Sequence, residues 1–590
     1  MGYILFLVSF LSLSFCYSKV SRRRVEIVAP TVFFFISFLL YLSGIIFSNL
    51  IYGSVFILLL SGLILMYYTY NFIRCKKKIE IRGGMNLIIL YIVVGIILIG
   101  FKAFAWDDFS HWLLTVKNMY LYDELSNNLK STIYFRTYPP ATALLQYFFN
   151  FIQKINFWKV DIEYNSQFIT NYFIMSLLLS ITNMTNLNQK SKRIIYIFLF
   201  LIPALFNSEV YVSLYVDSIL AIVGAYILIY YENLKWGKNL KNRYVFIDIF
   251  LAIIFLTLVK ATGIAIVLFC LIYIVLDMII MKHYKLNIKI ILVILVSAFS
   301  GKQSWNYYIE MTKANVIWRT QKITFISILE ILSGKGLEYQ YKASERFVEA
   351  VFRRNIGLTT YAVVFLTLSG ILLYRYLKNK DRKNLKLLLY NFLILIIYPI
   401  SLLIMYLFIF HEIEASKLAS FDRYMSTIAI FLIILDIVLL VKDKIILKYE
   451  KILILLSLVL FFSNSTMKKI TIRRNKAAKT TNKIRSQIKK VPEVIGEGSR
   501  IFFISNMAVD EGFYYWIYRY EATPYKIQET YYDKNIDLPV LLREYDYLYL
   551  KDFDESFLNK YSQFFDKRVD SDSYYKIIKD KNRIRLEKLN

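Results

Sequence analysis

LIILYIVVGIILIGFKAFAWDDFSHW, residues 87–112, is the stretch that decides the fold. Its first part, residues 87–105, is an apolar run long enough to cross about 30 Å of hydrocarbon. Directly after the run, Asp107, Asp108 and His111 stand at a predicted membrane–water boundary. A charge in hydrocarbon costs at least ~2.5–3.5 kcal/mol on insertion scales, so an acidic pair at this depth favours a functional role. The alternative is a solvated loop that ends a helix.

The rest of the chain repeats this apolar pattern. Of the 590 residues 57% are hydrophobic, and the mean hydropathy is +0.47. Apolar runs of roughly 17–25 residues recur and predict a polytopic α-helical membrane protein. A net charge of +29 would indicate nucleic-acid binding in a soluble protein. Most of the Lys and Arg residues here lie in short tracts between apolar runs, as cytoplasmic loops require, so we expect no nucleic-acid partner.

The cysteine content and the most abundant residue types narrow the class of protein further. Only three cysteines occur, and they are scattered, which indicates neither a disulfide framework nor a metal site. Heavy use of Ile, Lys, Asn, Tyr and Phe is typical of an AT-rich genome. We therefore expect a multi-pass protein of the bacterial plasma membrane.

Placing every strongly basic short loop up to Lys451 on the cytoplasmic side gives about 14 spans. The fifth and sixth expected spans cover residues 168–185 and 194–206, and the fourteenth covers residues 452–462. The basic tract 468–490 then falls outside, so either a long terminal domain is translocated despite its charge or one span is miscounted. The expected parts are additional helices over residues 1–84, a membrane module over 85–467 with outer loops 106–164, 301–358 and 411–425, and a soluble α/β domain over 468–590.

Local patterns predict several shorter elements. Tyr138-Pro139-Pro140 opens an amphipathic helix that we expect to lie in the membrane interface. The break at residues 259–263 divides one hydrophobic stretch into two spans and predicts a turn at the outer surface. A helix is expected around residues 345–354. In the terminal domain, residues 499–505, 545–550 and 574–578 read as strands and 513–520 as a helix.

The expected outer face collects acidic and basic residues that suit one reaction class. Besides the acidic pair it holds Asp217, Lys260, Lys302 and Arg423. A carboxylate there can take the proton of a hydroxyl that attacks a sugar. Cations at the membrane surface can stabilise the negative charge of a departing lipid phosphate, and arginine matches phosphate with a bidentate fork. These residues favour transfer of a sugar from a lipid phosphate to a hydroxyl.

Five segments together resemble the GT-C superfamily of membrane glycosyltransferases, especially protein O-mannosyltransferases and aminoarabinose transferases. They are residues 106–112 (WDDFSHW), 138–140 (YPP), 215–221 (YVDSILA), 259–263 (VKATG) and 421–424 (FDRY). The similarity covers the chain from about residue 85 to its C-terminus, and the first three spans look like an addition. A terminal extracytoplasmic domain also fits the resemblance.

The resemblance implies an inverting transferase that uses a polyprenyl-phosphate sugar on the outer face of the membrane. Asp107 or Asp108 would be the base, and Lys260 and Arg423 would contact the phosphate. His111 and Asp217 are further candidate substrate-binding residues. Some relatives use a divalent cation such as Mg²⁺ or Mn²⁺ and others do not, and the acidic residues here do not decide between them. A cell-surface glycan, a teichoic acid and a glycolipid all remain open as the acceptor.

Each candidate also has a structural interpretation. His111 could hydrogen-bond within a folded loop, and Lys260 and Lys302 could extend to the surface. Asp217 could cap its helix, and Arg423 could pair with its neighbour Asp422. At the level of function, a transporter or flippase of lipid-linked sugars is the alternative, for which midplane ionisable groups and inverted repeats are expected. An enzyme like the O-antigen polymerases and ligases is a further alternative.

Overall fold

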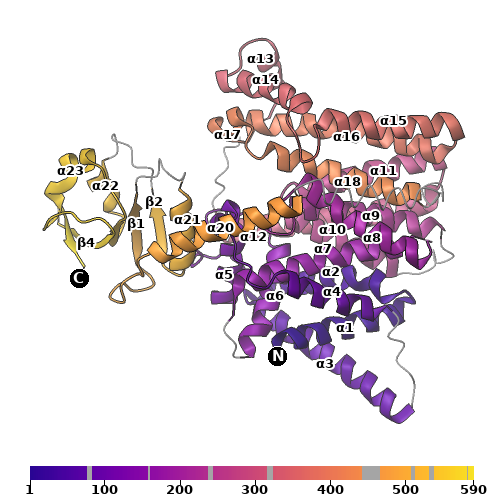
Figure 1. Cartoon of the computed structure of the whole chain (residues 1–590), viewed down its shortest axis with the longest axis horizontal. Coiled ribbons are helices and arrows are strands. Elements are labelled where there is room, and N and C mark those ends of the chain that lie inside the picture. The colour runs from indigo at the N-terminus through magenta and orange to yellow at the C-terminus, as the bar shows by residue number, and fades with distance from the viewer. Residues whose placement is uncertain are drawn as a thin grey trace. The chain divides into compact units, whose positions relative to one another are not determined.

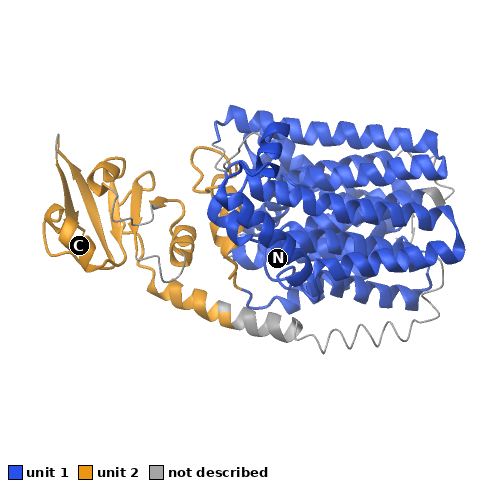
Figure 2. Cartoon of the chain, turned by 90° about the horizontal axis from the view of Figure 1, so that it is seen from above, with its two compact units in different colours: residues 1–101, 135–471 blue, residues 102–134, 472–590 orange. Residues whose placement is uncertain are grey.

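A computed structural model gives the structure of the protein. It describes residues 1–75, 83–156, 160–185, 187–236, 244–314, 323–441, 466–505, 512–529, 537–580 and 583–589. The chain divides into two compact units, which are coloured separately in Figure 2. Unit 1 comprises residues 1–101 and 135–471, and unit 2 comprises residues 102–134 and 472–590. Each unit is described by itself below.

Unit 1 is helical (Figure 1). Its long helices are α1 (Gly2–Ser21), α2 (Val25–Phe47), α3 (Leu50–Cys75), α4 (Gly84–Ile97), α6 (Ala141–Ile155), α7 (Ile162–Asn183), α8 (Gln189–Phe206), α9 (Asp217–Trp236), α10 (Tyr244–Val259), α11 (Gly263–Met281), α12 (Tyr284–Met311), α15 (Tyr361–Asn379), α16 (Arg382–Phe408) and α18 (Phe421–Val441). Shorter helices are α13 (Phe325–Leu332), α14 (Glu338–Arg353) and α17 (Glu412–Lys417).

Among the described residues, nine helices are long and apolar enough to cross a membrane: α1, α2, α3, α9, α11, α12, α15, α16 and α18. Helices α4 and α10 are apolar but shorter. The protein is therefore a helical membrane protein, as the sequence predicts, but the count of 14 spans is not reproduced. Helices α7 and α8 stand where the fifth and sixth spans were expected and are not among the nine. The fourteenth expected span lies outside the described residues.

One expectation about the loops of unit 1 is confirmed in part, and another is wrong. Helix α6 follows Pro140 as predicted and packs on α2 and α7 with residues 141–153 all buried, while its place in the membrane interface stays a prediction. Some of its polar side chains bond within the protein, as where Gln146 donates to Thr170 Oγ1 at 2.9 Å. The second outer loop was expected to start at residue 301, but α12 continues to Met311 and includes Lys302.

Unit 2 combines a segment from early in the chain with the C-terminal residues. The early segment holds a π-helical turn, η1 (Asp108–Trp112), and α5 (Leu113–Tyr122). The C-terminal part holds most of α20 (Thr466–Gln487), α21 (Phe513–Ala522), α22 (Leu538–Leu542), α23 (Glu555–Tyr561) and a 3-10 turn, η4 (Ser562–Phe564). Its strands are β1 (Arg500–Ile504), β2 (Lys526–Glu529), β3 (Tyr547–Leu550), β4 (Ser573–Lys579) and β5 (Ile584–Lys588).

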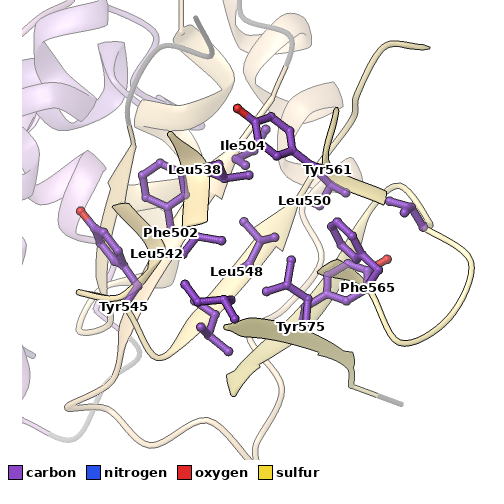
Figure 3. Packing of buried hydrophobic residues seen from close by; sticks show 14 of the residues in the cluster. Phe502, Ile504, Leu538, Leu542, Tyr545, Leu548, Leu550, Tyr561, Phe565 and Tyr575 are labelled. Carbon is purple, nitrogen blue, oxygen red and sulfur yellow. The ribbon is translucent and has the colours of Figure 1, made fainter. Parts of the chain in front are cut away.

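The strands form one sheet in the order β2-β1-β3-β4-β5. Strand β1 is parallel to β2 and β3, while β4 is antiparallel to β3 and β5. Side chains alternate between the two faces of a strand, so neighbouring residues of β1 enter different cores. Phe502 belongs to a cluster with Leu548 and Tyr575 (Figure 3), whereas Phe503 belongs to a second cluster with Tyr518.

The sequence-based prediction for this domain is confirmed for β1, β3, β4 and α21. The short strand β2 and the charged strand β5 (Ile-Arg-Leu-Glu-Lys) were not predicted. Both lie at the edges of the sheet, where a strand has only one hydrogen-bonded neighbour and its residues need not be hydrophobic.

Candidate functional site

Three of the candidate residues meet in unit 1. Asp217 is the first residue of α9, Lys260 lies in the turn between α10 and α11, and Arg423 lies in the first turn of α18. Lys260 Nζ is 2.9 Å from Asp217 Oδ1, and Arg423 Nε is 3.3 Å from Asp217 Oδ2. One carboxylate therefore holds two cations, and the three side chains carry one net positive charge. We call these residues the Asp217 triad.

The turn that carries Lys260 requires the glycine that follows it. The Gly263 N–H donates to the Lys260 carbonyl at 2.8 Å and closes the turn. A Cβ added to Gly263 would lie 2.1 Å from the Leu256 carbonyl oxygen of α10, which is closer than any side chain can approach. The sequence Val-Lys-Ala-Thr-Gly thus lets α11 start directly against the end of α10 and fixes the position of the lysine.

The triad is buried and charged. Lys260 is 8% exposed and Asp217 is 3% exposed. Burial lowers the pKa of Lys260, but Asp217 and Tyr424 together raise it by more, so the pKa of the lysine lies above its ordinary value. Aromatic faces also stabilise the cations: Lys260 Nζ is 4.9 Å from the ring centroid of Tyr424, and the Arg423 guanidinium is 4.1 Å from that of Tyr215.

An apolar cavity of about 230 Å³ opens beside the triad. Lys260, Asp217 and Tyr424 give it one polar end. Apolar side chains line the rest, including Leu220, Ile266, Phe269, Leu402, Met405 and Phe410. Asp217, Lys260, Tyr424 and Tyr138 come from four of the segments that carry the GT-C resemblance, so those segments converge on one cavity within unit 1.

Tyr398 of α16 also lines the cavity, and sequence analysis missed it. Its hydroxyl donates to the Tyr424 carbonyl at 2.7 Å. The signal that could have found it is Pro399, which interrupts a long apolar run. Proline cannot donate to the Leu395 carbonyl, and the Tyr361 hydroxyl of α15 donates to that carbonyl at 3.0 Å instead. A proline inside a predicted span therefore indicates a stretch of helix in which a side chain from another helix can hydrogen-bond to a backbone carbonyl.

Asp107, Asp108 and His111 belong to unit 2, and the structure does not bring them together with the Asp217 triad in one unit. Asp108 is fully buried, and His111 is 4% exposed. Both lie in the π-helical turn η1, and turns of this kind are frequent at functional sites. The expected convergence of the acidic pair with Lys260 and Arg423 stays a prediction.

Aromatic residues of the C-terminal part hold this turn. The Trp106 ring stacks on Phe513 at a centroid distance of 5.8 Å, and Phe109 meets Phe513 and Tyr520 edge-on at 6.0 and 5.6 Å. Lys117 Nζ donates to the Tyr520 carbonyl at 2.5 Å. Helix α21 therefore forms the support on which the Asp-Asp segment rests.

The described residues offer no ready set of metal ligands. No three His, Cys, Asp or Glu side chains among them are grouped so that they could hold a metal ion. Mg²⁺ can also be held by one or two carboxylates together with substrate phosphates, so a divalent cation stays a prediction, and no step is assigned to a metal below.

Comparison with known proteins adds no assignment. No protein-family model matches the chain, and neither a curated protein nor a solved structure matches it.

Proposed function

We propose that this protein is an inverting membrane glycosyltransferase that moves a sugar from a polyprenyl phosphate to an acceptor hydroxyl. The observation that carries the proposal is the cavity beside the Asp217 triad, which has Lys260 and Asp217 at one end and apolar walls elsewhere within one helical unit. Arg423 adjoins this end through its ion pair with Asp217, so the triad as a whole carries one net positive charge. A polyprenyl phosphate has the same two-part chemistry, with an anionic head and a hydrocarbon tail. The resemblance of five segments to GT-C enzymes supports the same reaction class.

The backbone around the cavity also favours an anion. Helices α9, α11 and α18 begin at Asp217, Gly263 and Phe421, so three helix N-termini lie near the triad. The N-terminal end of a helix carries a partial positive charge and backbone N–H groups that attract phosphate. Asp217 holds Lys260 and Arg423 close together despite their like charges. A phosphate would thus meet cations that are already in position, which limits the entropic cost of binding.

The proposed reaction breaks one bond and forms one bond. Asp107 or Asp108 accepts the proton of the acceptor hydroxyl as its oxygen attacks the anomeric carbon of the sugar. The bond from that carbon to the phosphate oxygen breaks, and the electron pair leaves with the polyprenyl phosphate. Lys260 and Arg423 stabilise the charge that develops on the phosphate. Attack from the face opposite the leaving group inverts the anomeric carbon.

The expected setting is the outer face of the bacterial plasma membrane, with a cell-surface glycan, a teichoic acid or a lipid as acceptor. Membrane lipids and the lipid-linked donor are the partners that this reaction requires.

The test is turnover of the purified full-length protein in liposomes with a polyprenyl-phosphate sugar, measured as release of polyprenyl phosphate. Replacing the base, by Asp107→Asn or by Asp108→Asn, should lower the rate by about 10²–10⁴-fold. Asp123→Asn is the matched control, because Asp123 ends α5 with a left-handed backbone (φ 53°) that asparagine also adopts readily.

Two results would overturn the proposal. Full turnover in both base variants would remove the acidic pair from the chemistry. Movement of the labelled sugar across the bilayer without bond cleavage would identify a transporter of lipid-linked sugars instead.

A further inference from the structure

Helix α13 is a short helix without a buried side chain. It has 8 residues, none of them buried. Thr324 and Ser327 form a reciprocal cap at its start, in which each side-chain oxygen accepts the other residue's backbone N–H at 3.0 Å. Isolated helices of fewer than about 12–15 residues are marginal in water, and most helices owe their stability to packing of an apolar face. α13 therefore needs a surface on which to rest.

The outward face of α13 is apolar. Phe325, Leu329 and Leu332 are 76%, 46% and 77% exposed, and their spacing places them on one side of the helix. Ile326, next to them, is 68% exposed. Ser327 and Ile331, on the opposite side of the helix, are half-buried, as is Ile328 at the border of the apolar face. A contiguous apolar face turned outward marks an interaction surface.

Helix α14 holds α13 at the end of a candidate span. The Tyr341 hydroxyl of α14 donates to the Ile331 carbonyl at 3.0 Å and accepts the Gly336 N–H at 2.6 Å, which fixes the turn between the two helices. The Tyr339 hydroxyl and the Gln340 side-chain amide both donate to the Leu407 carbonyl, at 2.9 and 3.0 Å. Leu407 is the penultimate residue of α16, so α14 is attached where that span ends. Figure 1 shows α13 beyond α14, on the outside of the helices.

The elements before and after α13 identify its environment. Helices α12 and α15, which flank the α13–α14 segment in the chain, are both candidate spans. Both expose large apolar side chains where a membrane would contact them, including Phe299 at 68% and Leu366 at 67%. The connection between these two spans, residues 312–360, is attached through α14 to the end of a third span, which places α14 and the adjoining α13 near the membrane boundary.

We propose that α13 is a membrane-surface helix that inserts Phe325, Leu329 and Leu332 into the headgroup–acyl boundary of the bilayer. The partner of the exposed apolar face of α13 is lipid, and this inference does not depend on the proposed enzymatic activity. It also places a bilayer contact next to the cavity, because α14 binds the segment of α16 that supplies Met405 to the cavity wall.

The test uses spin labels on single cysteines in the full-length protein in liposomes of phosphatidylethanolamine and phosphatidylglycerol. The three native cysteines are first replaced by serine. Labels are placed at Phe325→Cys and Leu332→Cys on α13, at Leu366→Cys in a span, and at Glu345→Cys on the exposed polar side of α14. Each label is then scored for collision with oxygen, which concentrates in lipid, and with a nickel chelate, which stays in water.

Labels on α13 should be severalfold more accessible to oxygen than to the chelate, as at residue 366, while the label at residue 345 should show the reverse. Chelate accessibility at residues 325 and 332 equal to that at residue 345 would overturn the proposal, because α13 would then lie in water. Shielding of both α13 labels from both reagents would overturn it as well, because a protein partner or a second copy would then cover the face.

Discussion

Replacing Lys260 by methionine should weaken binding of a lipid phosphate while the fold survives. Methionine keeps most of the side-chain volume and removes the charge. Arg423 still partners the Asp217 carboxylate at 3.3 Å after the change, so no buried charge is left alone. The loss of one charge-assisted hydrogen bond to phosphate is worth about 1.5–3 kcal/mol. Since 1.4 kcal/mol is a factor of ten, Kd for polyprenyl phosphate should rise about 10- to 150-fold.

A second buried lysine in unit 1 provides the matched control. Lys386, in the first turns of α16, lies 2.6 Å from Glu232 Oε1 and 2.7 Å from Asp277 Oδ1. These partners lie near the last turns of α9 and α11, about 14–15 residues or roughly 22 Å along each helix from the ends that face the cavity. Here one cation holds two carboxylates, the inverse of the Asp217 triad.

Lys386→Met should therefore show the opposite pattern. It removes the lysine that contacts both buried carboxylates, Glu232 and Asp277, and breaking a buried ion pair in this way costs about 3–5 kcal/mol of stability. Binding by the protein that remains folded should be unchanged. The assay is thermal unfolding in detergent, paired with titration of polyprenyl phosphate onto folded protein. Two outcomes would refute the role of Lys260 in phosphate binding. One is an equal weakening of binding in both variants. The other is a Kd for Lys260→Met within a factor of about three of the wild-type value, a difference below ~0.7 kcal/mol.

Two further predictions concern the supports of the candidate residues. Gly263→Ala should destabilise the protein by about 1–3 kcal/mol, because the new Cβ would lie 2.1 Å from the Leu256 carbonyl. Gly62→Ala in α3 has no neighbour within 4 Å of the new atom and should be neutral or stabilising by up to about 1 kcal/mol, so similar melting temperatures for the two variants would contradict the reasoning. Phe513→Ala removes the ring that contacts Phe109, so amide hydrogen exchange over residues 106–112 should accelerate while exchange in strand β3 stays slow. Unchanged exchange over residues 106–112 would show that α21 does not hold this segment.

The sequence by itself determined the class of the protein and several local elements. Apolar runs of membrane-spanning length predicted the helical membrane part, because hydropathy depends on composition and not on which helices meet. The Val-Lys-Ala-Thr-Gly break predicted the turn between α10 and α11, since a polar group and a glycine cannot continue an apolar helix pair without a bend. Short runs rich in Ile, Phe and Tyr predicted three strands of the terminal sheet.

Only the tertiary structure decided which charges pair. Sequence reading treated Lys386 as one of several basic residues in a cytoplasmic loop, but it is 4% exposed and bound between two helices. The structural alternative for Arg423 was a pair with its neighbour Asp422, yet Arg423 binds Asp217, whereas Arg354 pairs with Asp422 at 2.7 Å. Helical periodicity shows which residues share a face, but the partner across that face depends on how the helices pack.

The tertiary structure also decided that residues 102–134 join the C-terminal part of the chain in unit 2. Sequence analysis assigned residues 102–105 to the end of a span and residues 106–134 to the following loop of the membrane module. A segment between two helices is most simply expected to pack on its neighbours in the chain. The contacts that override this expectation are aromatic, such as Trp106 on Phe513. These contacts join residues about 400 positions apart in the chain. No local sequence pattern encodes such a pairing, because the two contacting surfaces form only when both segments fold.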